Sequence, residues 1–372
     1  MRVHDVDRVF HYAVPASLAD RIAVGFRVAV PFGRRSRVEG YVVGLAESSD
    51  RPELKEVAEI LDDEPLLTPS AIAVAKWMRD YYLCTLSEAL QCFLPPGASL
   101  RAKRRASEQI LPAFEVKDRE SAASLLPALR ARAPKQAAAL EYLLSHDRPC
   151  TSVEMKRAGI GADALARLAE KGVVLPVRLR AVRSPLGPGG VPTRAAHRLS
   201  PAQSAALARI VESVRRREAR AHVLQGVTGS GKTEVYLQAI AEATRRGLGA
   251  ILLVPEISLT EQTVAHLRAF FGSNLAVLHS RLSLGERFDQ WHAIRRGEVS
   301  IVVGARSAVF APVQNLGLLI VDEEHETSYK QEEAPRYHAR EVAWARAREE
   351  GATLVLGSAT PALETRLAAD RG

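Results

Sequence analysis

A glycine-rich motif in the second half of the chain has the residue types and spacing needed to bind nucleotide phosphates. Residues 226–233 read Gly-Val-Thr-Gly-Ser-Gly-Lys-Thr and match G-x-x-x-x-G-K-[ST] at every fixed position. The glycines let backbone N–H groups approach phosphate oxygens, and a helix that begins here adds its positive dipole end. Lys232 should reach the β- and γ-phosphates, and Thr233 should offer its hydroxyl to Mg²⁺. The motif predicts that ATP is bound by Gly226, Val227, Thr228, Gly229, Ser230, Gly231, Lys232 and Thr233.

An acidic pair follows an apolar run further along the chain. Leu318–Val321 has the composition of a buried strand, and Asp322 and Glu323 come directly after it. Ligands of an open α/β sheet bind at the carboxyl ends of its strands. Asp322 should therefore hold Mg²⁺ together with Thr233, and Glu323 should polarise the attacking water. A solvated acidic turn is the alternative, but the phosphate-binding motif requires a magnesium carboxylate. The candidate catalytic residues are Lys232, Asp322 and Glu323.

Residues 198–372 must position these groups. Six apolar runs alternate with amphipathic helical patterns in this part of the chain. The runs are Ala221–Gln225, Ala250–Val254, Leu275–Leu278, Ser300–Val303, Leu318–Val321 and Thr353–Leu356. Strands without polar alternation, separated by helices, predict a parallel sheet that is covered on both faces. A small-residue turn at Gly357–Thr360 becomes informative as the third motif after the phosphate-binding loop and the acidic pair.

Residues 1–98 are expected to form a separate, β-rich domain. Short β-prone runs at Arg27–Val30 and Tyr41–Leu45 are bounded by glycine and proline, which is typical of a small barrel or sheet. Residues 68–93 then change to helical spacing, and a Pro-Pro-Gly step at 95–97 ends that pattern.

Residues 126–184 predict a winged-helix domain between two linkers, at 99–125 and 185–197. Three short helical patterns precede an apolar extended segment, which is the order found in winged helix-turn-helix domains. These segments are Gln136–Leu144, Ser152–Ala158, Asp163–Lys171 and Val173–Leu179. A helical spacer without DNA contact is the alternative for this region.

The composition of the chain indicates which kinds of partner and which cellular compartment to expect. The formal net charge of +8 favours polyanionic partners through counterion release. The three cysteines, Cys84, Cys92 and Cys150, form no C-x-x-C pair, so no zinc site is expected in this chain. The N-terminus lacks an apolar signal segment, and no apolar stretch approaches the roughly 18–20 residues of a membrane span. We therefore expect a cytoplasmic protein without a membrane partner.

Short motifs in a fixed order extend the pattern over nearly the whole chain. In the C-terminal half they are GVTGSGKTEVY (226–236), VPEISLTEQ (254–262), VLHS (277–280), GARSAVFAP (304–312), DEEH (322–325), SYKQEEAPRYHAR (328–340) and GSATPALET (357–365). In the N-terminal half they are FHYAVP (10–15), VAVPFG (28–33), ELKEV (53–57), WMRDYYLCTLSEAL (77–90) and LPPG (94–97). These residues resemble the family of primosomal replication-restart DNA helicases. The resemblance implies a multidomain protein with a β-rich N-terminal domain for DNA 3′ ends, a winged-helix domain and a RecA-like α/β lobe with a parallel sheet.

The resemblance also implies DNA-binding roles for particular residues. Four match the family's pocket for a 3′-terminal nucleotide: Phe10, His11, Gly33 and Lys55. His11 stands where many relatives carry Asp, and the neighbouring Tyr12 is expected to pack in the core. Nine match DNA-facing and coupling motifs of the lobe: Arg306, Ser307, Tyr329, Lys330, Arg336, Tyr337, His338, Ser358 and Thr360. In the loop at 328–340, aromatic faces should stack bases while cations hold phosphates. Gln203 matches a residue that reads adenine.

The function implied by the resemblance is that of an ATP-dependent 3′→5′ DNA helicase. Such a protein recognises stalled or abandoned replication forks and initiates replication restart by primosome assembly. Its implied partners are branched and single-stranded DNA with a 3′ end, single-strand-binding protein and other primosome proteins. The alternative is a non-catalytic fork-DNA-binding and primosome-loading module with a silent motor. A translocating motor of the restriction or chromatin type is disfavoured by the N-terminal motifs.

Two further features of the family bear on activity. Family members carry a second ATPase lobe and a cysteine-rich, zinc-binding region, whereas this sequence ends at Gly372, just after the Gly-Ser-Ala-Thr motif. Zinc is expected only in that cysteine-rich region. Because an arginine finger stabilises the transition state for phosphoryl transfer, we expect one lobe alone to hydrolyse ATP poorly.

Overall fold

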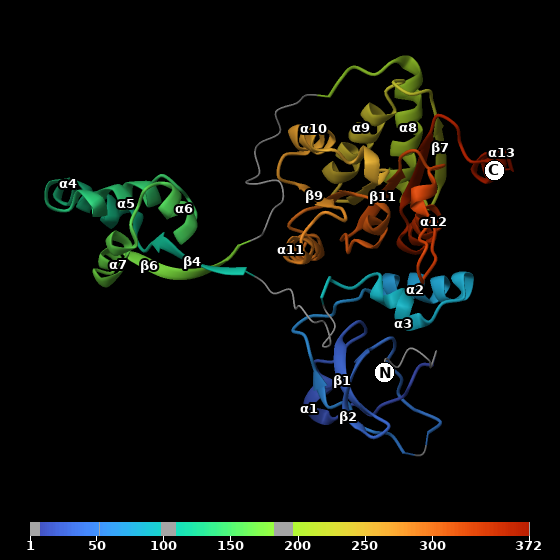
Figure 1. Ribbon diagram of the computed structural model, residues 1–372, viewed down its shortest axis with the longest axis horizontal. Coiled ribbons are helices and arrows are strands. Elements are labelled where there is room, and N and C mark those ends of the chain that lie inside the picture. The colour runs from blue at the N-terminus through green and yellow to red at the C-terminus, as the bar shows by residue number, and fades with distance from the viewer. Residues whose placement is uncertain (1–7, 52, 98–108, 182–195, 372) are drawn as a thin grey trace. The chain divides into compact units, whose positions relative to one another are not determined.

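The computed structural model describes residues 8–51, 53–97, 109–181 and 196–371 (Figure 1). The chain divides into two compact units, one made of Met1–Ala106 with Ser184–Gly372, and the other of Ser107–Arg183. The N-terminal region and the C-terminal lobe therefore belong to the same unit. Residues 99–108 and 185–195, which are parts of the two expected linkers, lie outside the described residues. None of the described helices is long and apolar enough to cross a membrane.

Six parallel strands form the sheet of the lobe, in the order β7-β12-β11-β8-β10-β9. The strands are β7 (Ala221–Gln225), β8 (Gly249–Leu253), β9 (Leu275–Leu278), β10 (Ile301–Gly304), β11 (Leu316–Val321) and β12 (Thr353–Ser358). Strands β8, β10, β11 and β12 are buried along their whole length. Burial on both faces explains why each strand is a continuous apolar run in the sequence. The predicted parallel sheet is confirmed.

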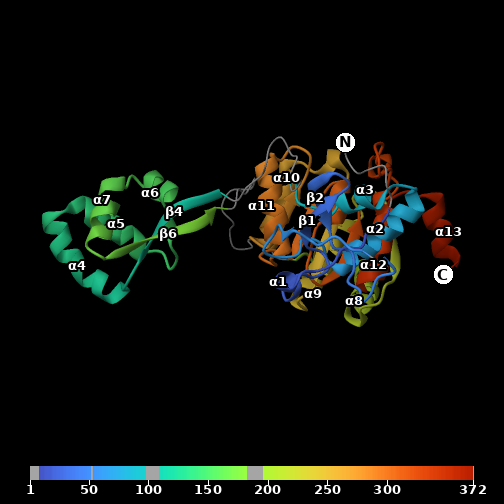
Figure 2. The same ribbon diagram turned by 90° about the horizontal axis from the view of Figure 1, so that it is seen from below.

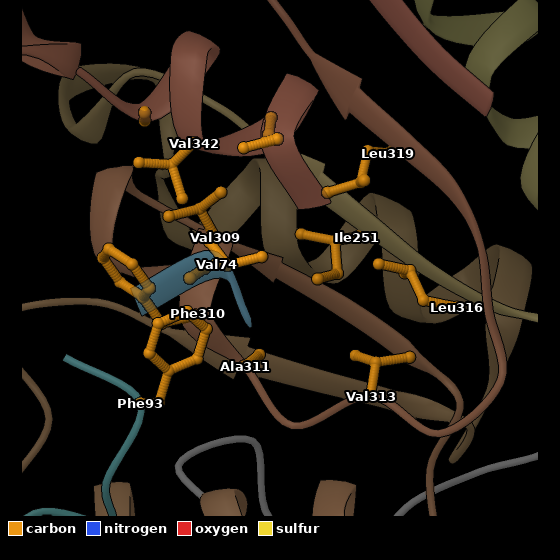
Figure 3. Packing of buried hydrophobic residues seen from close by; sticks show 14 of the residues in the cluster. Val74, Phe93, Ile251, Val309, Phe310, Ala311, Val313, Leu316, Leu319 and Val342 are labelled. Carbon is orange, nitrogen blue, oxygen red and sulfur yellow. The ribbon is translucent and has the colours of Figure 1, made fainter. Parts of the chain in front are cut away.

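Helices cover both faces of this sheet, as alternate residues of β8 show. Ala250 and Leu252 face the core beneath helices α8, α9 and α10, whereas Ile251 and Leu253 face the core beneath α11 and α12 (Figure 3). The helices of the lobe are α8 (Pro201–Arg216), α9 (Lys232–Arg245), α10 (Glu261–Phe271), α11 (Leu284–Arg295), α12 (Ala339–Glu350) and α13 (Leu363–Arg371). Because successive side chains of a strand point to opposite faces of the sheet, one strand contributes residues to both cores.

The N-terminal region contains helix α1 (Ala16–Ala19) and a three-stranded antiparallel sheet in the order β2-β1-β3. Its strands are β1 (Arg27–Phe32), β2 (Arg35–Tyr41) and β3 (Glu59–Ile60). The expected strand at Tyr41–Leu45 is wrong, because Tyr41 is the last residue of β2 and residues 42–45 lie beyond the strand. A tight turn at Gly33 brings the chain back against β1 from Arg35 onward, so the paired strand begins and ends earlier in the sequence than expected.

Helices α2 (Pro69–Tyr82) and α3 (Leu86–Gln91) join this region to the lobe. Leu83 adopts a left-handed conformation (φ 52°) that ends α2, and Thr85 forms a capping box that begins α3. Their apolar residues, with Phe93, belong to the same core as helix α12 (Figures 1 and 3). The Trp291 indole N–H also donates to the Phe93 carbonyl at 3.2 Å. The two parts of this unit thus share one core.

The second unit is a three-stranded antiparallel sheet with four helices (Figure 2). Its elements are β4 (Gln109–Val116), α4 (Arg119–Arg132), α5 (Pro134–Leu144), β5 (Cys150–Thr151), α6 (Ser152–Arg157), α7 (Ala162–Glu170) and β6 (Val174–Ala181). The expected linker is wrong over residues 109–125, where β4 and the first half of α4 lie. Strand β4 pairs with β6 along its whole length and buries Ala113, and Asp118 caps α4. The winged-helix assignment stays a prediction.

Candidate nucleotide and DNA sites

The phosphate-binding loop connects the end of β7 to the start of α9. Gly229 and Gly231 have φ angles of 79° and 81°, which favour glycine. A Cβ at Gly231 would lie 2.4 Å from the Gln203 side-chain nitrogen, and a Cβ at Gly226 would lie 2.6 Å from the Ser230 hydroxyl. The loop therefore forms a tight cradle that side chains at these glycines would fill. Such a cradle fits phosphate, because phosphate needs close backbone approach.

Gln203 fastens this cradle from the first turn of helix α8. Its side-chain oxygen accepts from the Ser200 N–H at 2.8 Å, and the Ser200 hydroxyl accepts from the Gln203 N–H at 3.3 Å. The Gln203 side-chain nitrogen donates to the Ser230 carbonyl at 2.8 Å. The amide thus fixes the loop conformation, while its contact with adenine stays a prediction.

Lys232 lies where the loop meets the acidic pair. Its ammonium donates to the Gly226 carbonyl at 2.7 Å and lies 3.5 Å from a Glu323 carboxylate oxygen. The side chain is only 9% exposed. Thr233 follows in the first turn of α9 and is exposed. The structure therefore brings the predicted Lys232, Thr233 and Glu323 to the same end of the sheet.

Asp322 is held by two buried tyrosine hydroxyls. Tyr236 of α9 donates to its Oδ1 atom at 3.0 Å, and Tyr329 donates to its backbone carbonyl at 2.6 Å. Burial raises the pKa of Asp322, and the hydrogen bond from Tyr236 opposes this shift. A bound cation would favour the charged carboxylate in the same way. Sequence reasoning missed Tyr236, although it stands within the GVTGSGKTEVY motif.

The oxygen atoms available at this site fit Mg²⁺ rather than a metal that is coordinated by protein side chains alone. Among the described residues, no group of three or more His, Cys, Asp or Glu side chains could hold a metal. Mg²⁺ is commonly bound through one or two carboxylates together with substrate phosphates. Asp322 and Glu323 supply carboxylates beside the phosphate cradle, and Thr233 supplies a hydroxyl on the first turn of α9.

Ser358 links the DEEH motif, through His325, to the phosphate-binding loop. Its hydroxyl lies 2.7 Å from the His325 ring nitrogen and accepts from the Thr360 N–H at 3.0 Å. Its carbonyl accepts from the Gly226 N–H at 3.1 Å. The turn at Gly357–Thr360 thus contacts both the DEEH motif and the phosphate-binding loop.

A buried carboxylate behind this site was missed by sequence reasoning. Glu324 is completely buried and accepts hydrogen bonds from Arg340 at 2.8 Å, from the Thr365 hydroxyl at 2.9 Å and from the Ala362 N–H at 2.7 Å. Arg340 also donates to the Thr365 hydroxyl at 3.1 Å. These contacts join the end of the DEEH motif to two other motifs. Only the tertiary structure reveals the network.

A groove of about 1290 Å³ opens beside the acidic motif. Six of the predicted DNA residues line it: Arg306, Ser307, Tyr329, Lys330, Tyr337 and His338. The Arg306 guanidinium donates to the carbonyls of Ser328 and Lys330 at 3.2 and 2.5 Å. Three other predicted residues, Arg336, Ser358 and Thr360, do not line the groove.

The predicted stacking of bases on this loop is wrong for its two tyrosines. Tyr329 is 1% exposed and Tyr337 is 5% exposed, and both belong to the core that α2 and α12 share. The Tyr329 hydroxyl is bonded to Asp322, and the Tyr337 ring packs edge-on against Phe310 with centroids 4.8 Å apart. Neither ring presents a free face, because the core covers it.

The predicted 3′-end residues gather around the turn between β1 and β2. Phe10 is 41% exposed and packs edge-on against Phe32, with centroids 5.0 Å apart. The Lys55 ammonium donates to the Gly33 carbonyl at 3.3 Å. His11 contacts the Ser49 hydroxyl at 2.7 Å instead.

Tyr12 differs from its neighbours in this cluster. Its hydroxyl donates to the Pro31 carbonyl at 3.1 Å, and its ring packs against a small core with Val28 and Val30. This contact agrees with its expected packing role. An apolar cavity of about 300 Å³ adjoins both Tyr12 and Phe10.

Comparisons with known proteins match both parts of the chain. Residues 2–95 match the 3′DNA-binding domain of PriA, and residues 200–368 match the DEAD/DEAH box helicase family. The replication restart protein PriA of Bacillus subtilis is 36% identical over 431 residues, which cover 99% of this chain and 53% of that protein. The replication restart protein PriA of Haemophilus influenzae is 36% identical over 96% of this chain and 48% of that protein.

Solved structures add a more distant likeness. A hypothetical ATP-dependent RNA helicase from Sulfolobus tokodaii is 18% identical, with a TM-score of 0.33 over 45% of this chain and 49% of that one. The chain spans about half the length of the curated relatives it matches. With a 3′ DNA-binding domain, a helicase domain and this similarity along nearly its whole length, the chain resembles the replication restart protein PriA.

Proposed function

We propose that this chain supplies the DNA-end recognition and the first motor lobe of an ATP-dependent 3′→5′ DNA helicase. The helicase recognises stalled or abandoned replication forks and initiates restart by primosome assembly. The proposal rests on the position of Asp322. Its carboxylate accepts a hydrogen bond from Tyr236 of α9, the helix that follows the phosphate-binding loop, and its backbone carbonyl accepts one from Tyr329, which lines the groove. The nucleotide site and the wall of the groove thus meet at one residue.

Each residue of the nucleotide site has a separate role in ATP hydrolysis. Lys232 exchanges the Gly226 carbonyl for phosphate oxygens, and the backbone of the glycine loop orients them. Asp322 and Thr233 would hold Mg²⁺, which neutralises the charge on the transferred phosphoryl group. Glu323 lies 3.5 Å from Lys232 and is placed to polarise the attacking water. Tyr236 keeps the Asp322 carboxylate oriented through its hydrogen bond.

Three surfaces recognise DNA in this proposal. Phe10 and Lys55 receive an exposed 3′ end, with Phe10 as a stacking face and Lys55 as a cation. The groove lined by Arg306 and Lys330 holds single-stranded DNA. The unit at Ser107–Arg183 binds a duplex arm as a winged helix. Phosphate contacts and stacking carry little sequence information, so fork shape determines specificity. Single-strand-binding protein and other primosome proteins are the proposed protein partners.

Steady-state ATP hydrolysis tests the enzymatic function. We expect this chain to hydrolyse ATP slowly, and forked DNA with a 3′ end at the branch to stimulate turnover. If the chain binds forked DNA but shows no turnover, it acts as the fork-binding and primosome-loading module instead. If it binds neither ATP nor forked DNA, both functions fail.

Replacing Phe10 with alanine tests the 3′-end pocket. We expect roughly 5-fold or greater loss of affinity for forks with a free 3′ hydroxyl, because stacking on an aromatic ring contributes about 1–3 kcal/mol per base. Forks with a 3′ phosphate should bind both proteins equally. Val9→Ala is the matched control, because Val9 is the neighbouring residue and is 55% exposed. Equal losses for the two DNA ends would contradict the pocket.

A further inference from the structure

Helix α2 carries three aromatic side chains near its C-terminal end, and one of them, Tyr82, contacts His338 of the loop at residues 328–338. Trp77 and Tyr81 lie one turn apart and stack, with ring centroids 4.9 Å apart and an interplanar angle of 19°. Tyr82 meets both rings edge-on, at 5.8 Å from Trp77 and 4.9 Å from Tyr81. Tyr81 is 57% exposed, and Leu83 beyond it is 91% exposed. Trp77 and Tyr82 are partly buried against the shared core, so Tyr81 is the ring of this cluster that faces solvent.

The aromatic cluster is joined to the candidate DNA groove through Tyr82. The Tyr82 hydroxyl accepts from the His338 N–H at 3.1 Å and donates to the His338 carbonyl at 3.4 Å. The Lys330 ammonium lies 5.4 Å from the Tyr82 ring centroid, within the range of a cation–π interaction. Lys330 and His338 both line the groove. The rings of α2 thus continue from the groove wall.

The charges around these rings suit a polyanion. Lys330 donates its ammonium hydrogen to a neutral backbone carbonyl of its own loop, so this contact leaves its positive charge uncompensated. Asp80, next to Tyr81 in sequence, is paired with Arg79 at 2.8 Å. Glu341 is paired with Arg340 at 3.1 Å. A phosphate backbone would therefore meet a cation beside the rings, where Asp80 and Glu341 are each paired with an arginine.

We propose that Trp77, Tyr81 and Tyr82 form a base-stacking platform for single-stranded DNA. The tyrosines of the loop itself are buried, so the solvent-exposed aromatic face next to this cationic loop comes from α2. Stacking accepts any sequence because every base has a π-face, which suits a strand that is moved through a helicase. The platform rests on the proposed function, because it assigns where the same DNA strand is held.

The test is binding of labelled oligo(dT) with a 3′ phosphate, followed by fluorescence anisotropy. Tyr81→Ala should weaken binding by about 5- to 100-fold, because it removes one stacking face. Tyr81→Phe should bind as the unmodified chain does, because it keeps the ring. Leu83→Ala is the matched control, since it removes exposed apolar surface at the same end of α2 without removing a ring. DNA should also quench the fluorescence of Trp77, so Trp77→Phe should lower the quenching of tryptophan fluorescence while binding persists.

Each outcome of the test has one meaning. Equal affinity for Tyr81→Ala and Leu83→Ala, with oligo(dT) still bound, would overturn the platform. Failure of the unmodified chain to bind oligo(dT) and forked DNA would overturn the proposed function itself. Thermal unfolding of Tyr81→Ala should match the unmodified chain, because more than half of the side chain is already exposed.

Discussion

Replacing Lys232 with alanine should lower DNA-stimulated ATP hydrolysis by at least about 100-fold, the usual effect of removing one preorganised charge at a transition state. The ammonium is nearly buried, donates to the Gly226 carbonyl and lies 3.5 Å from Glu323. A charge in such a position interacts strongly with phosphate because little water screens it. Affinity for oligo(dT) without nucleotide should not change, because Lys232 is not among the residues that line the DNA groove.

The control for this prediction is Arg246→Ala. Arg246 directly follows the same helix, α9, at its other end and pairs with Glu242 at 2.6 Å, so its loss removes a cation without touching the phosphate cradle. Turnover is measured with and without forked DNA, and nucleotide affinity with a fluorescent ATP analogue. If Lys232→Ala and Arg246→Ala hydrolyse ATP at the same rate, the glycine loop is not the working nucleotide site.

Contiguous features of the sequence predicted most of the lobe. Each of the six apolar runs overlaps an observed strand, because parallel strands buried on both faces need no polar alternation. The phosphate-binding loop was predictable because its residues are consecutive in the sequence. Its glycines are also required sterically, since a Cβ at Gly226 or Gly231 would clash with neighbouring side chains. Lys232 and Glu323 were brought together as predicted, because both follow strands of one parallel sheet.

Features that depend on distant segments were not predictable. The sequence around β4 predicts a linker because its partner strand, β6, follows four helices later and nothing local marks the pairing. Tyr329 and Tyr337 stand in a polar, charged loop, yet packing against α2 and α12 buries them. Glu324 resembles any residue of an acidic turn until Arg340 and Thr365 surround it.

Tyr236 and Gly357 are such a distant pair, and replacing Gly357 with alanine should have a large effect. A Cβ there would lie 1.6 Å from the Tyr236 hydroxyl and 2.8 Å from its Cζ atom. The tyrosine is 1% exposed, so it has no free space to enter. We expect a loss of about 1–3 kcal/mol in the free energy of unfolding, typical of an overpacked core. Urea unfolding measures it, and Gly44→Ala is the control because no atom lies within 4 Å of its Cβ position.

The same substitution should weaken Mg²⁺-dependent nucleotide binding by about tenfold, because displacing Tyr236 removes a hydrogen bond to the charged Asp322 carboxylate. Combining Gly357→Ala with Tyr236→Phe separates the two effects. The double variant lacks the oxygen that clashes first, so it should recover part of the lost stability. It still lacks the donor to Asp322, so the Mg²⁺ titration of nucleotide binding should stay weak. Recovery of both properties would show that the hydroxyl only fills space and does not orient Asp322.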